Sequence, residues 1–242
     1  MSTPVVSARH FAGTPTVGAL FLPGFYPRLH TCTASVVRSA SGSVIMTAAH
    51  CVHGSGKGYV FAPGYRDGRT PFGVWRVTAA YGSRGWVRAH RPQQDWAFLL
   101  VRPREVGGRR QVVEQVTGAN LLGSAPRVGT TVEVPAYPIA VAGRAITCQA
   151  SVYRHAGYPA FDCGGYVGGT SGAPWLVGTR RGRAVVGLVA GLHQGGCTPG
   201  TSYSPQLGPA ARRALVRADR RAPPDVFPGA LPDGCSASPN RP

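Results

Sequence analysis

Short apolar runs separated by turn residues are the feature that most restricts how this chain can fold. Runs of four to eight residues rich in Val and aromatic side chains recur between clusters of Gly, Pro and Ser, and the 242 residues include 34 Gly and 22 Pro. Such runs are typical of β-strands, and this content of Gly and Pro is high for a helical protein. We therefore predict an all-β fold. The first-half strand candidates are residues 17–22, 33–37, 44–47, 59–62, 73–80 and 96–101.

A charged segment at 102–110, which also contains Pro and Gly, is expected to cross to a second set of strands. Only Pro209–Asp219 has the pattern of a helix, with Pro in the first turn and Ala, Leu and Arg throughout. The second-half strand candidates are residues 111–116, 130–135, 145–153, 173–177 and 184–192.

The length fits one structural domain, because all-β barrels commonly reach this size without splitting. We expect a flexible N-terminal arm over residues 1–16 and a single domain over residues 17–242. Its two halves are expected at about 17–105 and 106–207, ahead of the helix and an irregular, Pro-rich tail.

The formal net charge is +17, and nearly all of it is arginine, since Lys57 is the only lysine. A basic surface of this kind can attract nucleic acid or acidic peptides. The arginines are spread through the chain instead of being grouped on one helix, so we expect a solvated basic surface with no specific nucleic-acid partner. No stretch approaches eighteen uninterrupted apolar residues, so no membrane span is expected.

Six cysteines are present, with no CxxC pair and no His at zinc-finger spacing to them. Three disulfides and no metal site are the simplest interpretation. Disulfides persist in oxidising compartments, so we expect a protein that works outside the cell, although the first residues show no export signal. The cysteines are Cys32, Cys51, Cys148, Cys163, Cys197 and Cys235.

Three separate stretches supply a base, a carboxylate and a nucleophile: His50 in TAAHC, Asp95 in QQDWAFLLV and Ser171 in GGTSGAPW. A serine hydroxyl is a poor nucleophile until an imidazole takes its proton, and the imidazole needs a carboxylate to fix its tautomer. Each has a structural alternative when taken alone: a core histidine, a turn-capping Asp and a Gly-rich loop. Together, in this order, they indicate acyl-transfer chemistry, most simply peptide hydrolysis.

The glycines around Ser171 permit a tight turn in which successive backbone N–H groups converge on one point. We expect the N–H groups of Gly169 and Ser171 to stabilise the oxyanion of a tetrahedral intermediate, at on the order of 3 kcal/mol per donor.

The combination TAAHC, DWAFL and GGTSGAP resembles the trypsin/chymotrypsin-like serine protease family, and most closely its bacterial, secreted, glutamyl-endopeptidase-like branch. The resemblance covers roughly residues 17–207. It implies two antiparallel six-stranded barrels with the active site between them, and a peptidase that needs no cofactor. It also implies His50 as general base and then acid, Asp95 as its orienter and Ser171 as nucleophile, acting on peptide or protein substrates. We expect a monomer.

The chain departs from the family pattern at informative positions. Thr170 stands where animal members carry the Asp that receives a newly cut N-terminus, so activation of that kind has no acceptor here. Gly165 stands at the floor of the specificity pocket, where trypsin-like members carry an acidic residue. The absence of a carboxylate at this position disfavours cleavage after Arg or Lys, although the nearby Asp162 keeps such cleavage possible. His193 in GLHQGG resembles the histidine that binds substrate Glu in glutamyl endopeptidases, with a structural histidine as the alternative.

The resemblance also implies a Cys32–Cys51 bridge beside the general base. For the other four cysteines two arrangements remain open: Cys148–Cys163 with Cys197–Cys235, or Cys163 joined to Cys197 across the specificity pocket. Two further functions are kept as alternatives: a catalytically silent binding module for acidic polymers on the same barrels, and an esterase on the same site.

Overall fold

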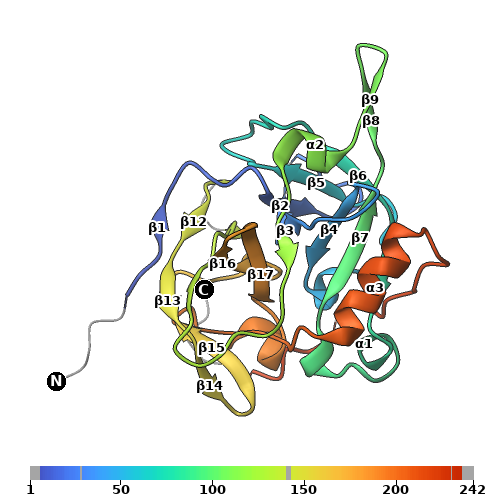
Figure 1. Cartoon of the computed structure of the whole chain (residues 1–242). Helices are drawn as coiled ribbons and strands as arrows, with labels where there is room; N and C mark the ends of the chain where they lie inside the picture. The colour runs from blue at the N-terminus through green and yellow to red at the C-terminus, as the bar shows by residue number, and fades with distance from the viewer. Residues whose placement is uncertain (1–5, 28, 140–142, 230, 236–242) are drawn as a thin grey trace.

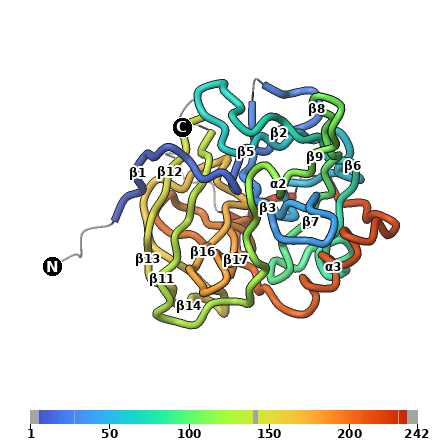
Figure 2. The backbone as a smooth tube through the Cα atoms, turned by 45° about the horizontal axis from the view of Figure 1, so that its top comes forward, coloured from blue at the N-terminus to red at the C-terminus, as the bar shows by residue number. Residues whose placement is uncertain are grey.

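A closed six-stranded barrel forms the first half of the protein in the computed structural model, which describes residues 6–27, 29–139, 143–229 and 231–235. Its strands pair in the order β2–β3–β4–β7–β6–β5, and every pairing is antiparallel. Figures 1 and 2 show these strands beside those of the second half. The strands are β2 (Val17–Phe21), β3 (His30–Val36), β4 (Val44–Thr47), β5 (Val60–Pro63), β6 (Trp75–Gly82) and β7 (Ala97–Val101).

The barrel strands are continuous apolar runs because both of their faces are covered. All five residues of β2 and all five of β7 are buried. A barrel of this size has an interior just wide enough for side chains to fill. Large side chains on these strands, including Phe61, Trp75 and Phe98, are fully buried.

The second half is also built of strands, arranged as three sheets in the described residues. The largest is β10–β17–β16–β11–β13, next to β14–β15–β18 and the pair β1–β12. Beyond β11 the pairing toward β12 continues through the Val134 N–H, which donates to Cys148 O, and through the isolated bridge Ala136–Ile146. This half is thus more interrupted than the continuous six-stranded barrel that the family resemblance implies. The bounds are β1 (Arg9–His10), β10 (Leu121–Leu122), β11 (Thr131–Glu133), β12 (Ile146–Thr147), β13 (Gln149–Ser151), β14 (Tyr153–His155), β15 (Tyr158–Asp162), β16 (Pro174–Thr179), β17 (Gly182–Leu188) and β18 (Thr201–Tyr203).

Helix α3 (Pro209–Asp219) lies at the predicted position and packs on the outside of the barrel against β6 and β7 (Figure 1). Ala211, Ala214 and Ala218 are its buried residues, at the spacing of one helix face. The all-β class and the C-terminal helix predicted from the sequence are confirmed. The other helices of the described residues are short, α1 (Arg84–Ala89) and α2 (Val113–Thr117), as are the 3-10 turns η1 (Ala49–Cys51), η2 (Pro92–Gln94) and η4 (Leu192–Gly195).

The strand expected at residues 111–116 is wrong, because most of that stretch is α2. One distant and one local contact favour the helix: the backbone N–H of Glu114 donates to the carbonyl of Gly42, and Thr117 Oγ1 donates to Val113 O one turn earlier. The crossover expected at 102–110 contains a hairpin, β8 (Arg104–Val106) with β9 (Arg109–Gln111), which projects from the body in Figure 1.

The N-terminal segment makes specific contacts in its described part. β1 pairs with β12, and Ser7 bridges to Gly164 in the second half. Figure 1 shows the segment running along that half before it enters β2. Residues 6–11 of the expected flexible arm are therefore bonded to the second half, and the domain boundary at residue 17 stays a prediction.

Three disulfides join Cys32 to Cys51, Cys148 to Cys163 and Cys197 to Cys235. The first ties η1 to β3, and the third holds the tail against the segment after η4. Of the two arrangements open for the last four cysteines, the structure has the first. Among the described residues no helix is long and apolar enough to cross a membrane.

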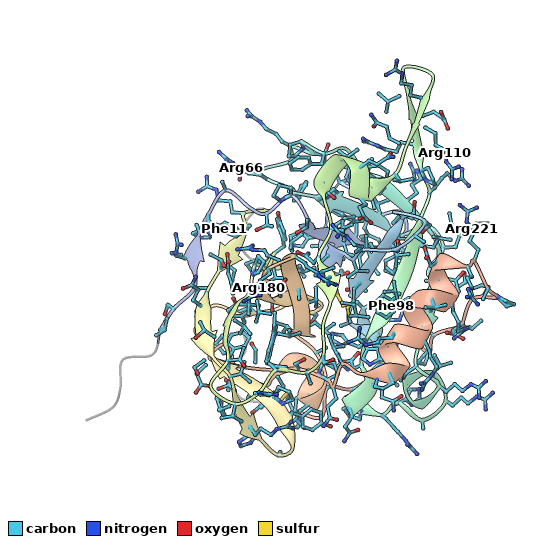
Figure 3. The ribbon with its side chains drawn as sticks, viewed as in Figure 1. Phe11, Arg66, Phe98, Arg110, Arg180 and Arg221 are labelled. Carbon is cyan, nitrogen blue, oxygen red and sulfur yellow. A yellow bond between two sulfur atoms is a disulfide. The ribbon has the colours of Figure 1, made fainter. Side chains whose placement is uncertain are left out.

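Arginine side chains are dispersed over the molecule. Arg66, Arg110, Arg180 and Arg221, labelled in Figure 3, come from four different segments, and all four are exposed. The dispersal agrees with the expectation of a solvated basic surface.

Candidate active site

His50 and Asp95 are paired directly. Nδ1 of His50 lies 2.7 Å from Oδ2 of Asp95, and the backbone N–H of His50 donates to Oδ1 at 2.9 Å. His50 sits in η1, directly after β4, and Asp95 ends η2 just before β7. Since β4 and β7 are neighbours in the barrel, their ends bring the two residues together.

The Asp95 carboxylate is fully buried, with a side-chain exposure of 0 %. A buried charge is costly unless it is paired and hydrogen-bonded. Its third donor is the backbone N–H of Gly191, 2.9 Å from Oδ2. Gly191 has a φ of +86°, and a Cβ there would lie 3.0 Å from the backbone nitrogen of Pro205, so glycine is favoured at this position.

Ser171 lies half-buried in the loop that precedes β16. Its carbonyl oxygen accepts from the N–H of Thr33 at 2.8 Å, and Gly172 N–H donates to Val189 O at 2.8 Å. Gly172 has a φ of +84°, and any Cβ there would overlap the carbonyl oxygen of Thr33. The loop is therefore anchored on β3 of the first barrel and on the end of β17.

The loop of Ser171 lies against the turn that carries His50. A Cβ placed on Gly172 would be 2.9 Å from the backbone nitrogen of Ala48, two residues before His50. The segment after β17 joins both parts, because Val189 bonds to Gly172 and Gly191 bonds to Asp95. The structure thus brings the three predicted segments together. No hydrogen bond between His50 Nε2 and the Ser171 hydroxyl is present in the described part of the chain.

The two backbone groups predicted as oxyanion donors lie in a fixed loop. Gly169 has a φ of +91°, and a Cβ there would be 2.6 Å from Ile139 N and 2.7 Å from Tyr137 O. The Gly169 carbonyl accepts from Thr33 Oγ1 at 2.9 Å. Within the described ranges, neither the Gly169 nor the Ser171 N–H donates to a protein acceptor.

Thr33 and Thr47 were not found from the sequence, although both support this loop. Thr33 Oγ1 also accepts from Tyr137 N at 3.0 Å, and Thr47 Oγ1 donates to Thr33 O at 2.8 Å. Both threonines are fully buried in strands β3 and β4. A hydroxyl in an otherwise apolar strand is the signal that points to such a role.

The three residues considered for specificity have different settings. Gly165 is exposed, with a φ of +101° and the methyl of Ala8 as the nearest atom to a Cβ placed there, at 3.5 Å. Asp162 accepts hydrogen bonds from the hydroxyls of Tyr153 and Thr201, each at 2.8 Å. His193 lies in η4, where its Nδ1 is 3.1 Å from Asp233 O of the tail.

Thr170 is buried and closes the turn before Ser171. Its hydroxyl donates to Val167 O at 2.8 Å. Val17 begins β2 inside a continuous chain, where its N–H donates to Thr14 O at 2.9 Å.

One group of potential metal ligands is found among the described residues. His193, Cys197 and Cys235 offer ligand atoms within 4.8 Å of one another. Both sulfurs belong to the Cys197–Cys235 disulfide, so neither is available as the thiolate that zinc prefers.

No protein-family model and no curated protein matches the sequence. Solved structures match over most of the chain. The protease Anisep from Arthrobacter nicotinovorans is 22 % identical, with a TM-score of 0.74 over 88 % of this chain and 99 % of its own. The thermostable serine protease AL20 from an extremophilic microorganism is 25 % identical, with a TM-score of 0.71 over 86 % of this chain and 98 % of its own.

A Glu endopeptidase in complex with MPD has 17 % identity and a TM-score of 0.67, covering 91 % of this chain and 100 % of its own. These identities are low, whereas the coverage of both chains is high, so the comparisons support the family-level resemblance at the level of the fold. The chain has the chymotrypsin-like fold of bacterial serine proteases.

Proposed function

We propose that the protein is a serine endopeptidase that hydrolyses peptide bonds through an acyl-enzyme intermediate. The observation that carries this proposal is the buried pair in which Asp95 accepts from both Nδ1 and the backbone N–H of His50. An acceptor at Nδ1 places the ring proton there and leaves Nε2 free to act as a base. The fold shared with serine proteases supports the same assignment.

The proposed reaction begins when His50 Nε2 takes the proton of the Ser171 hydroxyl as Oγ attacks the substrate carbonyl. The resulting oxyanion is held by the N–H groups of Gly169 and Ser171. His50 then gives its proton to the leaving amine, and the acyl-enzyme forms as the C–N bond breaks. A water, activated by His50 in the same way, releases the acid and restores the serine.

For specificity we propose that the pocket does not favour Arg or Lys, because Gly165 supplies no carboxylate. A preference for substrate Glu is the candidate that involves His193. With Nδ1 facing the Asp233 carbonyl, only Nε2 is left to meet a substrate.

We further propose that the protein works outside the cell as a monomer and needs no cofactor. Its three disulfides support an oxidising environment. Its expected partners are peptide or protein substrates.

The test is labelling with a fluorophosphonate probe followed by peptide mapping. We expect covalent labelling at Ser171 and cleavage of a mixed peptide library, both lost in Ser171→Ala. Ser151→Ala, which removes an exposed serine from β13, is the matched control and should label normally.

The alternatives give different results. Hydrolysis of ester substrates without any peptide cleavage would indicate an esterase. Salt-sensitive binding of polyanions with no labelling would indicate a silent binding module and would overturn the proposal.

A further inference from the structure

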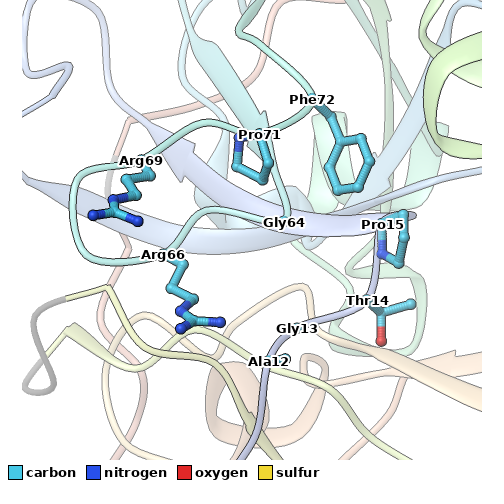
Figure 4. A pocket seen from close by; sticks show the side chains of 9 residues that line it. All are labelled: Ala12, Gly13, Thr14, Pro15, Gly64, Arg66, Arg69, Pro71 and Phe72. Carbon is cyan, nitrogen blue, oxygen red and sulfur yellow. The ribbon is translucent and has the colours of Figure 1, made fainter.

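A groove distinct from the Ser171 loop lies between the N-terminal segment and the loop that joins β5 to β6. One part of it is a pocket of about 370 Å³, lined by Ala12, Gly13, Pro15, Arg66, Arg69 and Phe72 among others (Figure 4). A second pocket shares Ala12 and Arg66 and adds Phe11, Asp67 and Arg144. Because the two share a wall, they form one groove, which we call the arginine groove. Neither His50, Asp95 nor Ser171 lines it.

A tight turn holds two of the arginines side by side. Arg66 and Arg69 exchange backbone hydrogen bonds of 3.0 and 2.8 Å, and the residues between them, Asp67 and Gly68, both have positive φ, +48° and +78°. This is the geometry of a two-residue hairpin turn, for which Asp-Gly is a favoured sequence. Side chains of residues paired in this way leave on the same face. In Figure 4 the Arg66 guanidinium extends toward Ala12 and Gly13.

Positive charge in the groove exceeds the negative charge that faces it. Asp67 is the only acidic residue among those that line it, and its carboxylate lies 3.2 Å from Arg144 Nε and 4.0 Å from Arg66 Nε. For the guanidinium of Arg69, no acceptor is present among the described residues. Like charges directly opposite one another on paired residues are unfavourable. An anion bound between the arginines would relieve this repulsion.

The other wall of the groove is apolar and firmly packed. The Phe72 ring lies against the backbone of Gly64, where a Cβ would come within 2.7 Å of Phe72 Cε2. Pro71 and Pro15 complete this wall. A ligand that fills the groove therefore meets guanidinium groups on one side and an apolar surface on the other.

We propose that the arginine groove binds an acidic, extended polypeptide segment. Its carboxylates would pair with Arg66, Arg69 and Arg144, since guanidinium and carboxylate match as bidentate partners, and an apolar side chain would rest on Phe72. A sulfated polysaccharide would use the charges but leave the Phe72 wall uncovered, so the mixed lining favours a peptide. This inference goes beyond the proposed function and does not require Ser171 to be catalytic.

The test measures binding of a fluorescein-labelled peptide of alternating Asp and Glu with one central Phe to the full-length Ser171→Ala protein, by fluorescence anisotropy. We expect Arg66→Gln/Arg69→Gln to raise Kd at least about tenfold. Phe72→Ala should raise it several-fold without changing its dependence on salt. The control is Arg109→Gln/Arg110→Gln, which removes the same charge from the exposed β9 strand and should leave Kd nearly unchanged.

Three results would overturn the proposal. One is equal loss from both double variants, which would mean that net charge alone attracts the peptide. Another is equal binding of the peptide with Asn and Gln in place of Asp and Glu. The third is tighter binding of dextran sulfate than of the peptide, with no effect of Phe72→Ala, which would indicate a polysaccharide site. Thermal melting checks that each variant is folded. If the Arg66→Gln/Arg69→Gln protein does not fold, the single substitution at the exposed Arg69, Arg69→Gln, replaces it in the binding measurement.

Discussion

Asp95 accepts two hydrogen bonds from His50, one from ring Nδ1 at 2.7 Å and one from the backbone N–H at 2.9 Å. The carboxylate therefore fixes both the ring and the turn that carries it. Gly191 adds a third donor from the second half of the molecule. One buried charge thus joins the barrel to the segment that follows β17, and the orientation of the imidazole depends on contacts from both halves.

Replacing Asp95 with Asn is expected to lower kcat by about 10⁴-fold, because an amide cannot accept from all three donors and favours the wrong imidazole tautomer. Cleavage of a fluorogenic peptide measures the effect, and circular dichroism measures the accompanying loss of stability. A variant that retains kcat within tenfold of the wild type would mean that Asp95 does not orient a catalytic base. Glu105→Gln, which changes an exposed acid on β8, is the control and should retain kcat.

Thr33→Val is expected to lower kcat by about 10- to 100-fold with a smaller change in KM. The hydroxyl of Thr33 positions the loop of Gly169 by donating to its carbonyl and accepting from Tyr137 N–H, and small displacements at such sites are costly. Removing it also leaves two buried backbone groups without a partner, at about 1–3 kcal/mol in the free energy of unfolding.

Thr78→Val provides the comparison for this effect. Thr78 Oγ1 donates to Leu100 O at 3.1 Å in the same barrel, away from the Ser171 loop. It should lose stability without losing kcat per folded molecule. If both variants lose kcat equally after correction for the folded fraction, Thr33 has a structural role only.

Parts of the fold were predictable because their signals are local. The barrel strands are short apolar runs bounded by turn residues, and α3 begins with Pro209 and has its small apolar residues on one face. The sequence of residues 111–116 does not distinguish a strand from a helix. The hydrogen bond from the Glu114 N–H to the Gly42 carbonyl, far away in the chain, favours the helix. Strands β15 and β18 were not predicted. Pro159 interrupts the apolar pattern of β15, and β18 is a short polar stretch, so neither has a local strand signal, and their pairing with each other stabilises both.

In the candidate site, too, residues with a local sequence signal were predicted and residues that depend on distant contacts were not. His50, Asp95 and Ser171 each stand in a recognisable local motif. Gly191 and Thr33 were missed because their roles depend on partners 96 and 136 residues away in the chain, Asp95 and Gly169. Spacing along a sequence says little about such pairs. The geometry that holds a site is thus harder to predict than the groups that would act in it.

Gly169→Ala is expected to abolish labelling of Ser171 by a fluorophosphonate. The added methyl requires a strained backbone at φ +91° and would lie 2.6 Å from Ile139 N, so the loop must move. Gly157→Ala is the matched control, because Gly157 has a similar φ of +83° with no atom within 4 Å of the new methyl. It should cost about 1 kcal/mol of stability and leave labelling intact. Normal labelling of a folded Gly169→Ala protein would contradict the assigned role of this loop.

The buried His30 is expected to make the protein less stable at mildly acidic pH. Burial lowers the pKa of His30 from 6.5, against the opposing effect of its hydrogen bonds to backbone carbonyls. Nε2 lies 3.1 Å from Tyr137 O, and the rings of Phe21, Tyr65 and Tyr137 surround it. Well above pH 6.5 the ring is neutral in both states, and His30 does not make stability depend on pH. Below about 6.5 the unfolded chain takes up a proton that the folded protein resists, so the free energy of unfolding falls.

The fall attributable to His30 can reach about 1.4 kcal/mol per pH unit until the folded-state pKa is passed. Urea unfolding of the Ser171→Ala protein between pH 7.5 and about 5 measures it, in a form that should not degrade itself. His30→Gln preserves a donor for Tyr137 O but cannot titrate, so its slope in this range should be shallower. The exposed His155→Gln should keep the original slope. Identical slopes for the parent and His30→Gln would mean that other groups set the acid sensitivity of the fold.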